Sequence, residues 1–355
     1  MSKIEINQLP VPTWTWLKVN EKSIEVPERI VPVEISTETM PAEVTEGTVA
    51  DITVTGFDGM ELGAGQDFKN YVVNADFPAV SYSVEAGVKV AEPIRINVSA
   101  AGNADECALN SMTFSLGEGA ELTAVLIFKG EGTIANDIRI EAEKNAKLTL
   151  VEVFQLGDKA VFIDSIGGTY DEKGGLKLIQ LSDNNEADAS SSQNISLSCA
   201  AELVGDKSTL DIDTAYLAKG DDKLDINYVA RHKGCLTDSK INVSGVLRDK
   251  ADKTFRGTID FIKGCKDATG DEREDVLLMD EGVHNRTVPL ILCAEEDVEG
   301  AHGASIGKIS DEILLYFQTR GISEDDINEL MAKSRIDAVA GRIPDEKTRE
   351  LLLSE

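Results

Sequence analysis

The sequence contains three histidines, and one of them, His302, stands where metal chemistry is possible. Glycines at positions 300 and 303 let backbone and partner groups approach the imidazole closely, and Glu299 lies three residues earlier. At the end of a strand, this Glu-x-x-His word could place a carboxylate and an imidazole beside one metal ion. Because such words are common, a hydrogen-bonded structural histidine is the competing interpretation.

The five cysteines form no CxxC pair and show no other short ligand spacing, which in a reducing compartment predicts free thiols. Cys235 is the thiol best suited to metal binding, because Arg231 and Lys233 beside it would lower its pKa and favour the thiolate. An inert Cys235 is the alternative. Cys265 has the same electropositive flanks. We expect the other three to be buried core residues: Cys107, Cys199 and Cys293.

Charge and motifs exclude several classes of function. The formal net charge of −29 would repel both a nucleic acid backbone and an anionic membrane surface. No phosphate-binding loop, dinucleotide fingerprint or nucleophile elbow is present, so energy for any reaction cycle must come from another chain. The N-terminus lacks the features of a signal peptide and no segment is apolar enough to span a bilayer, which predicts a cytoplasmic protein.

Short β-type runs separated by Gly, Asn, Asp and Lys turns fill the sequence from about residue 71 to residue 292. Three similar runs carry Leu122, Leu148 and Leu176 at separations of 26 and 28 residues. Such self-similarity favours stacked coils, in which each coil buries its apolar face against a neighbour. A parallel β-helix fits best, whereas a sandwich or an up-and-down barrel remains open.

Two appendages flank the coils, so we divide the chain into an N-terminal appendage (1–67), a β-helix core (68–308) and a C-terminal helical region (309–355). Trp14 and Trp16 alternate in a strand-like piece and are expected to dock the N-terminal arm onto the main body, with a ligand platform as the alternative. Ser310 and Ser323 are placed to cap two helices in the C-terminal region.

The block from Thr254 to Gly321 resembles the C-terminal core of the SufB/SufD family of iron–sulfur cluster assembly scaffolds. The matching words are FRG at 255–257, EGAHGAS at 299–305, and YF at 316–317 followed by RGI at 320–322. The resemblance implies a right-handed parallel β-helix, and it puts His302 at the position of the histidine that acts in nascent cluster assembly. Gly303 and Glu274 stand where SufB-type chains carry a glutamate and a cysteine, so the match is closer to SufD or to the short single-scaffold type.

The resemblance also implies a non-catalytic scaffold, a transient iron–sulfur cluster and a set of partners. The expected cluster site combines His302, Glu299 and Cys235 at a dimer interface formed by the last coils. The other half of the dimer is a second copy or a SufB-type subunit, and sulfur-donor proteins supply the sulfur. A SufC-type ATPase is expected to dock on the C-terminal helices through Tyr316, Phe317 and Arg320. A core position within its own helix is the competing interpretation of Phe317.

A β-helical carbohydrate-active enzyme, a lyase or a hydrolase, is the alternative function. Acidic coils could supply its catalytic carboxylates, but such an enzyme needs an aromatic-lined groove and usually export. Aromatic residues make up 5% of this chain and no signal peptide is evident, which weighs against this alternative.

Overall fold

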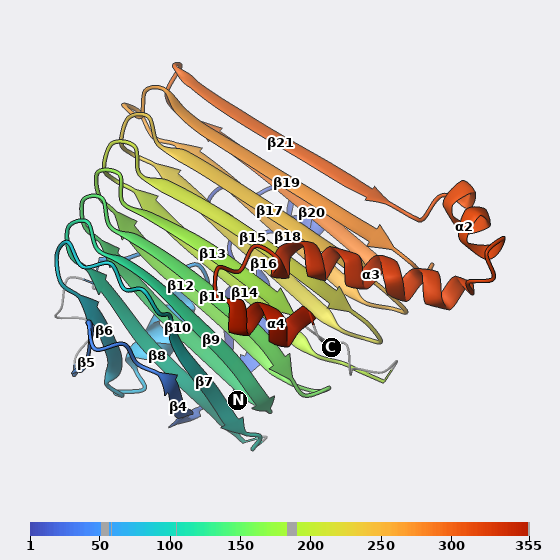
Figure 1. Cartoon of the computed structure of the whole chain (residues 1–355), viewed down its shortest axis with the longest axis horizontal. Coiled ribbons are helices and arrows are strands. Elements are labelled where there is room, and N and C mark those ends of the chain that lie inside the picture. Colours follow the sequence, from blue (N-terminus) through green and yellow to red (C-terminus); the bar gives the residue numbers. More distant parts are fainter. Residues whose placement is uncertain (51–56, 58, 104, 183–189, 354–355) are drawn as a thin grey trace.

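The chain folds into a parallel β-solenoid of about 8 turns, with helices at its C-terminal end (Figure 1). The computed structural model describes residues 1–50, 57, 59–103, 105–182 and 190–353. Each turn contributes one strand to each of two facing sheets. The solenoid confirms the fold class expected from the sequence.

Both sheets grow by one strand per turn, so neighbours in space are two elements apart in sequence. In spatial order, the first sheet contains β20 (His284–Cys293), β18 (Asp252–Phe261), β16 (Lys223–His232), β14 (Asn194–Leu203), β12 (Val161–Tyr170), β10 (Thr133–Ala142), β8 (Glu106–Leu116), β6 (Ala79–Val84) and β5 (Val44–Val49). The second sheet contains β21 (Val298–Gly307), β19 (Ala268–Leu278), β17 (Asp238–Leu247), β15 (Thr209–Ala218), β13 (Gly175–Ser182), β11 (Lys147–Leu156), β9 (Glu121–Glu131), β7 (Ile94–Ala101) and β4 (Glu34–Thr39).

The repeat of leucines marks the turns of the solenoid. Leu148 pairs in register with Leu122 on one side and with Leu176 on the other, so the separations of 26 and 28 residues each measure one turn. All three side chains are buried in the core between the sheets. Because a register slip by one residue would turn this row of leucines outward, the apolar pattern fixes the stacking of the turns.

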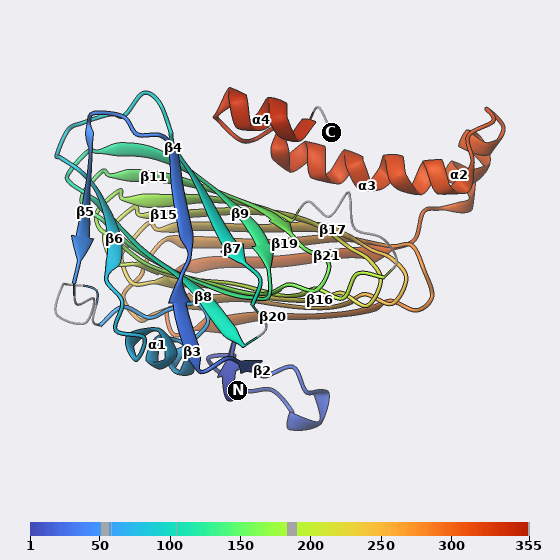
Figure 2. The same ribbon diagram turned by 90° about the horizontal axis from the view of Figure 1, so that it is seen from below.

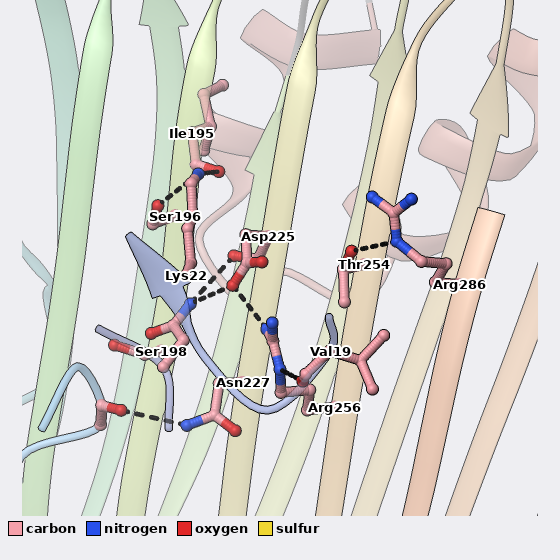
Figure 3. Close-up of polar contacts among 12 residues, drawn as sticks. Val19, Lys22, Ile195, Ser196, Ser198, Asp225, Asn227, Thr254, Arg256 and Arg286 are labelled. Atoms are coloured by element: carbon pink, nitrogen blue, oxygen red, sulfur yellow. Dashed lines mark hydrogen bonds and ion pairs between the residues drawn. The ribbon is translucent and has the colours of Figure 1, made fainter. Parts of the chain in front are cut away.

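The N-terminal residues form a hairpin that packs on the outer face of the first sheet (Figure 3). Its strands are β1 (Ser2–Ile6) and β2 (Lys22–Val26). The buried Arg256 guanidinium donates to the Val19 carbonyl at 2.5 Å and to Asp225 Oδ1 at 2.7 Å, and Asp225 also accepts from Asn7 Nδ2 at 2.7 Å. Arg256, part of the FRG word, therefore fixes the N-terminal segment to the solenoid.

The two tryptophans do not dock this hairpin, contrary to expectation. Trp14 directly precedes a short 3-10 helix, η1 (Thr15–Leu17), and Trp16 lies within it, so neither residue is in a strand. The exposed fraction is 72% for Trp14 and 70% for Trp16. The apolar contacts of the hairpin come instead from buried aliphatic side chains of the two strands, which pack beside helix α1 (Gln66–Val73). These side chains are Ile4, Ile6, Ile24 and Val26.

Further strands from the N-terminal segment join the sheets themselves. β4 pairs antiparallel with β7, β5 pairs antiparallel with β6, and β3 (Arg29–Pro32) pairs with β8. The segment 1–67 thus adds strands to the first turn of the solenoid as well as a hairpin outside it. Residues 51–56 and 58 of this segment and residues 354–355 of the C-terminal region lie outside the described residues. The division into three regions at 67 and 308 stays a prediction.

Three helices follow the last strand: α2 (Asp311–Gln318), α3 (Glu324–Ala340) and α4 (Glu346–Leu353). Ser310 and Ser323 accept hydrogen bonds from the backbone of the first turns of α2 and α3, as the sequence predicts. α3 and α4 lie along the outer face of the second sheet and bury an apolar cluster there, whereas α2 stands at the end of the molecule (Figures 1 and 2). None of the described helices is long and apolar enough to cross a membrane.

Candidate functional site

The solenoid ends at an uncovered turn formed by β20 and β21. Within the described part of the chain, each of these strands pairs with one neighbour, β18 or β19, and nothing pairs with its other edge. Every residue of β21 from Glu299 to Gly307 is exposed. The inner side chains of this turn therefore face solvent at what we call the open end, defined by residues 284–307.

A buried ionic cluster lies directly beneath the open end. Lys253 of β18 has no exposed side chain, forms an ion pair with Glu274 of β19, and donates to Asn285 Oδ1 of β20 at 3.1 Å. Thr287 donates to the second oxygen of Glu274 at 2.6 Å. Burial lowers the pKa of Lys253 to about 7, against the opposing charge of Glu272 and Asp225. The cluster thus connects three strands of the last two turns through charged groups.

Glu272 is the second carboxylate of this cluster, and the FRG word makes room for it. Burial raises its pKa to about 7, although the positive charge of Lys253 acts in the opposite direction. Its Oε2 atom is buried and has no hydrogen-bond partner among the described residues. A methyl group on Gly257, in the facing sheet, would come within 2.2 Å of this atom. A glycine at position 257 therefore keeps the space that the Glu272 carboxylate fills.

His302 belongs to the same inward face as Glu272. The parallel pairing of β19 with β21 sets Glu272 opposite His302 and Thr269 opposite Glu299. Side chains alternate along a strand, and neighbours in register share a face, so His302 points inward and Glu299 points outward. The surroundings of Gly300 support the inward direction of His302, because a methyl group on Gly300, which shares its face, would lie 3.0 Å from the Phe261 ring inside the solenoid. Within one chain, the structure does not bring Glu299 and His302 together.

Cys235 lies at a corner of the solenoid, in the turn between β16 and β17. Its Sγ donates to the Gly264 carbonyl of the next turn at 3.4 Å. The cations expected to act on its thiol are held in ion pairs: Lys233 with Glu202 at 2.6 Å, and Arg231 with the same carboxylate at 3.1 Å. Cys235 is therefore partly exposed at the corner, on a different part of the turn from His302.

Cys265 follows at the same corner, one turn further along the chain. Its electropositive flanks suggested a lowered thiol pKa, but the structure shows the opposite. The side chain is fully buried, and burial raises the pKa of this thiol to about 11, with further increases from the charges of Glu295, Cys293 and Cys235. The neighbouring lysines, Lys263 and Lys266, point into solvent and do not offset the loss of hydration. The apo protein thus holds Cys265 as a thiol.

Cys293, expected in the core, is exposed at the end of β20. Its position in register beside the buried Phe261 is an inward one, but β20 is the last strand of its sheet, so no further described strand covers it. The Sγ of Cys293 donates to the Glu295 carbonyl at 2.9 Å. Cys107 and Cys199 are buried, as expected. Sequence spacing hid the relationship among Cys235, Cys265 and Cys293, because one solenoid turn separates each from the next.

Of the partner-binding residues expected in the C-terminal region, Tyr316 and Phe317 lie on α2, which buries no side chain, and Arg320 follows two residues after its end. The Arg320 guanidinium stacks over the Tyr316 ring, 3.7 Å from the centroid, and donates to the Tyr316 carbonyl at 3.2 Å. The Phe317 ring lies edge-on to Tyr316 at 5.4 Å. Leu315 and Tyr316 are 63% and 54% exposed. α2 therefore presents an apolar and cationic surface that no other described element covers.

Comparison with known proteins gives a consistent set of relatives. Residues 98–335 match the family described as SUF system FeS cluster assembly, SufBD core domain. The chain is 23% identical to the iron–sulfur cluster assembly protein SufD of Bacillus subtilis over 257 residues, which are 65% of this chain and 59% of that protein. It is 24% identical to SufD of Escherichia coli over 155 residues, which are 44% of this chain and 37% of the relative. A SufBD family protein of Mycobacterium tuberculosis is 26% identical over 152 residues, 43% of this chain and 18% of its own length.

Proposed function

Because this chain belongs to the SufBD family of iron–sulfur cluster assembly proteins, we propose that it is a non-catalytic, cytoplasmic scaffold subunit on which a cluster is built. The observation that supports this role most directly is the open end, where a histidine on an uncovered turn lies above a buried cluster of charged side chains. A separate ATPase of the SufC type would supply the energy, and sulfur-donor proteins would supply the sulfur.

The open end suits assembly between two chains. The edges of β20 and β21 offer unpaired backbone groups, which favour pairing with another sheet edge. A second copy of this chain, or a SufB-type subunit, would cover these edges around a two-fold or pseudo-two-fold axis. The site would then be closed on both sides, and ligands from both subunits would reach the same cluster.

His302, Glu299 and Cys235 are the proposed cluster ligands at this interface. His302 contributes nitrogen from the inner face, where Glu272 is its neighbour in register. Glu299 is on the outward face of β21, and Cys235 lies at a corner two turns before the open end, so in this scheme they serve a cluster held between subunits rather than within one chain. The thiolate is the most important of the three, since iron in clusters strongly prefers sulfur ligands.

The ATPase is proposed to dock on α2. Tyr316, Phe317 and Arg320 form one exposed surface beside the open end, because α2 follows directly on β21. Binding there would place the nucleotide-driven movements of the ATPase next to the edge strands of the assembly site. In this arrangement the chain itself needs no catalytic residue.

Anaerobic co-expression with a SufC-type ATPase and the sulfur-donor proteins tests this proposal. Iron and acid-labile sulfide would be measured in the purified complex for the wild type, for His302→Ala and for His284→Ala. His284 is the matched control, since it lies exposed at the start of β20, far along the strand from Cys293. Strong loss of cluster in the His302 variant with retention in the His284 variant supports the proposal. Equal cluster content in all three proteins contradicts this role of the open end.

A further inference from the structure

The hairpin of β1 and β2 crosses the outer face of the first sheet toward the open end. Its aliphatic side chains pack with residues of β8, β10 and β12. Further along the hairpin, Lys22 Nζ donates to Ser196 Oγ of β14 at 2.8 Å. The Val19 carbonyl then accepts from Arg256 of β18, the strand next to the edge strand β20 (Figure 3). The loop that joins β1 to β2 is therefore the part of the hairpin nearest the open end.

This loop exposes an apolar surface. Four of its apolar side chains are exposed: Val11, Trp14, Trp16 and Leu17. The centroids of the two indole rings are 6.0 Å apart, and the short helix η1 buries no side chain. Thr13 donates to Asn20 Oδ1 through both its backbone amide, at 2.7 Å, and its hydroxyl, at 2.8 Å. These bonds close the base of the loop, so it presents its tryptophans in a defined conformation without covering them.

The outer face of the first sheet changes from polar to apolar at the open end. Side chains alternate along a strand, so the outward positions of β18 are polar ones: Thr254, Arg256, Thr258 and Asp260. In register with the last three of these, β20 carries an apolar row, defined by Val288, Leu290 and Leu292. The members of the apolar row are half-buried. An apolar row on the outer face of an edge strand, beside a polar strand, indicates that a partner covers it.

We infer that the loop of residues 11–18 contacts a second copy of this chain across the open end, with Trp14 and Trp16 packing on the apolar row of that copy. The inference rests on the proposed dimer and deepens it. It adds to the two sheet edges a contact surface on the outer face of the first sheet, made by the N-terminal segment.

A two-fold axis would bring each loop to the apolar row of the other copy. Antiparallel pairing of β20 with the β20 of a second copy sets the axis perpendicular to the sheet, and the two outer faces then form one continuous surface. Val19 lies over β18, so the second copy's β20 is two strand spacings away, about 10 Å. The few residues between Val19 and Trp14 can span this distance, since an extended chain covers about 3.3 Å per residue. Both copies make the same contact, as an isologous interface requires.

The chemistry of the loop favours a second copy as the occupant. Tryptophan is enriched at the buried centres of protein interfaces, where its large ring contributes much of the binding energy. The net charge of −29 opposes an anionic membrane surface, which exposed tryptophans would otherwise suit. Loop and apolar row are both present in every copy of the chain, so a second copy offers a matching surface to each loop.

Tryptophan fluorescence tests the inference, because both tryptophans of the chain lie in this loop. Emission of the full-length chain would be recorded along a dilution series, with light scattering on the same samples. We expect the emission maximum to move to shorter wavelength as the dimer forms and to return on dilution. The Ile306→Glu variant, expected to be monomeric, gives the emission of the uncovered loop.

Substitutions separate the loop from the sheet edges. A chain with both Trp14→Ala and Trp16→Ala should dimerise with a dissociation constant raised about tenfold or more. Leu290→Ser, in the apolar row, should weaken the dimer in the same direction and reduce the fluorescence shift. Phe77→Ala is the control, because Phe77 is exposed just before β6, toward the other end of the first sheet. Thermal melts identify any variant that fails to fold.

Each contrary result has its own meaning. A dimer that emits like Ile306→Glu, or an unchanged dissociation constant for the double tryptophan variant, overturns the loop contact and leaves the dimer intact. A fluorescence shift that occurs only after addition of a SufB-type subunit overturns the second copy as the occupant. A wild type that stays monomeric, with no shift in either case, overturns the proposed dimer as well, so the two failures are distinguishable.

Discussion

Glu272 and His302 are neighbours in register on β19 and β21, and they share the inward face of the solenoid at its open end. Glu299, which the Glu-x-x-His word sets three residues before the histidine, lies instead beside Thr269 on the outward face. The carboxylate paired in register with His302 is therefore Glu272, which precedes it in the sequence by one turn of the solenoid. This pairing connects the exposed histidine to the buried Lys253 and Glu274 beneath it.

Gly257→Ala should destabilise the protein, because its methyl group would meet the Glu272 carboxylate at 2.2 Å inside a packed interior. We expect the free energy of unfolding to fall by about 1–3 kcal/mol, measured by urea denaturation. Gly303→Ala is the matched control, since nothing lies within 4 Å of the added atom there. A Gly257 variant as stable as the control would mean that Glu272 does not occupy the space assigned to it.

A carboxyl pair deeper in the solenoid should make stability depend on pH. Glu152 and Asp164 are fully buried, and Gln180 Nε2 donates to both of them, at 2.7 and 2.8 Å. Burial raises the pKa of Asp164 to about 7, and burial together with the Asp164 charge raises the pKa of Glu152 well above its usual value. Between the unfolded and folded pKa values the native state binds more protons, so stability falls as pH rises from about 4 through 7.

Glu152→Gln should flatten this dependence, because an amide at position 152 keeps a hydrogen-bond donor toward Asp164 but cannot ionise. Melting temperatures measured at pH 5 and pH 8 give the comparison. The wild type should lose more stability between the two values than the variant. The same difference in both proteins would show that the pair does not share a proton in the native state.

Much of the fold could be predicted from the sequence because one solenoid turn repeats in the apolar pattern. The leucines at 122, 148 and 176 are direct neighbours in the second sheet, as their spacing suggests. The role of Arg256 could not be predicted, because its partner Val19 lies 237 residues away, on a hairpin that the coil pattern does not include. The prediction that the two tryptophans dock the hairpin was wrong for the same reason. Aliphatic side chains of the hairpin strands make its contacts with the solenoid instead.

The candidate site was only partly predictable. Short motif spacing points to His302, but the period of the solenoid is needed to see that Cys265 and Cys293 lie one and two turns beyond Cys235. Whether a cysteine side chain is buried likewise depends on which turn of the solenoid carries it, and not on the hydrophobicity of its neighbours in the sequence. Cys293 ends an apolar run, yet it is exposed because no further turn covers β20.

The open end should mediate dimer formation. Ile306 of β21 is 45% exposed among the inward-facing residues of the last turn, where a partner would cover it. Light scattering of the wild type should give about twice the chain mass of 38.3 kDa for a homodimer, or the summed mass of the two chains after addition of a SufB-type subunit. Ile306→Glu should yield a monomer, whereas Leu351→Glu, equally exposed on α4, should not. A monomeric wild type under all these conditions would falsify the dimer.

Tyr316→Ala should weaken binding of the ATPase at least tenfold, because it removes both the exposed ring and the stacking surface of Arg320. Gln318→Ala, also exposed on α2, is the control. Point variants are preferable to truncation after Gly307, since α3 covers the apolar outer face of the second sheet. Affinity is measured by calorimetry with a SufC-type ATPase. Unchanged binding by the Tyr316 variant would move the ATPase site away from α2.

The position of bound iron is the most direct test of the proposed assembly site. Crystals of the anaerobically loaded protein, measured at the iron absorption edge, show the metal as anomalous density without assumptions about ligands. We predict density at the open end, within bonding distance of His302. Iron bound elsewhere, for instance among the buried side chains around Asp164, or a loaded preparation without ordered iron at the last turn, would contradict the account.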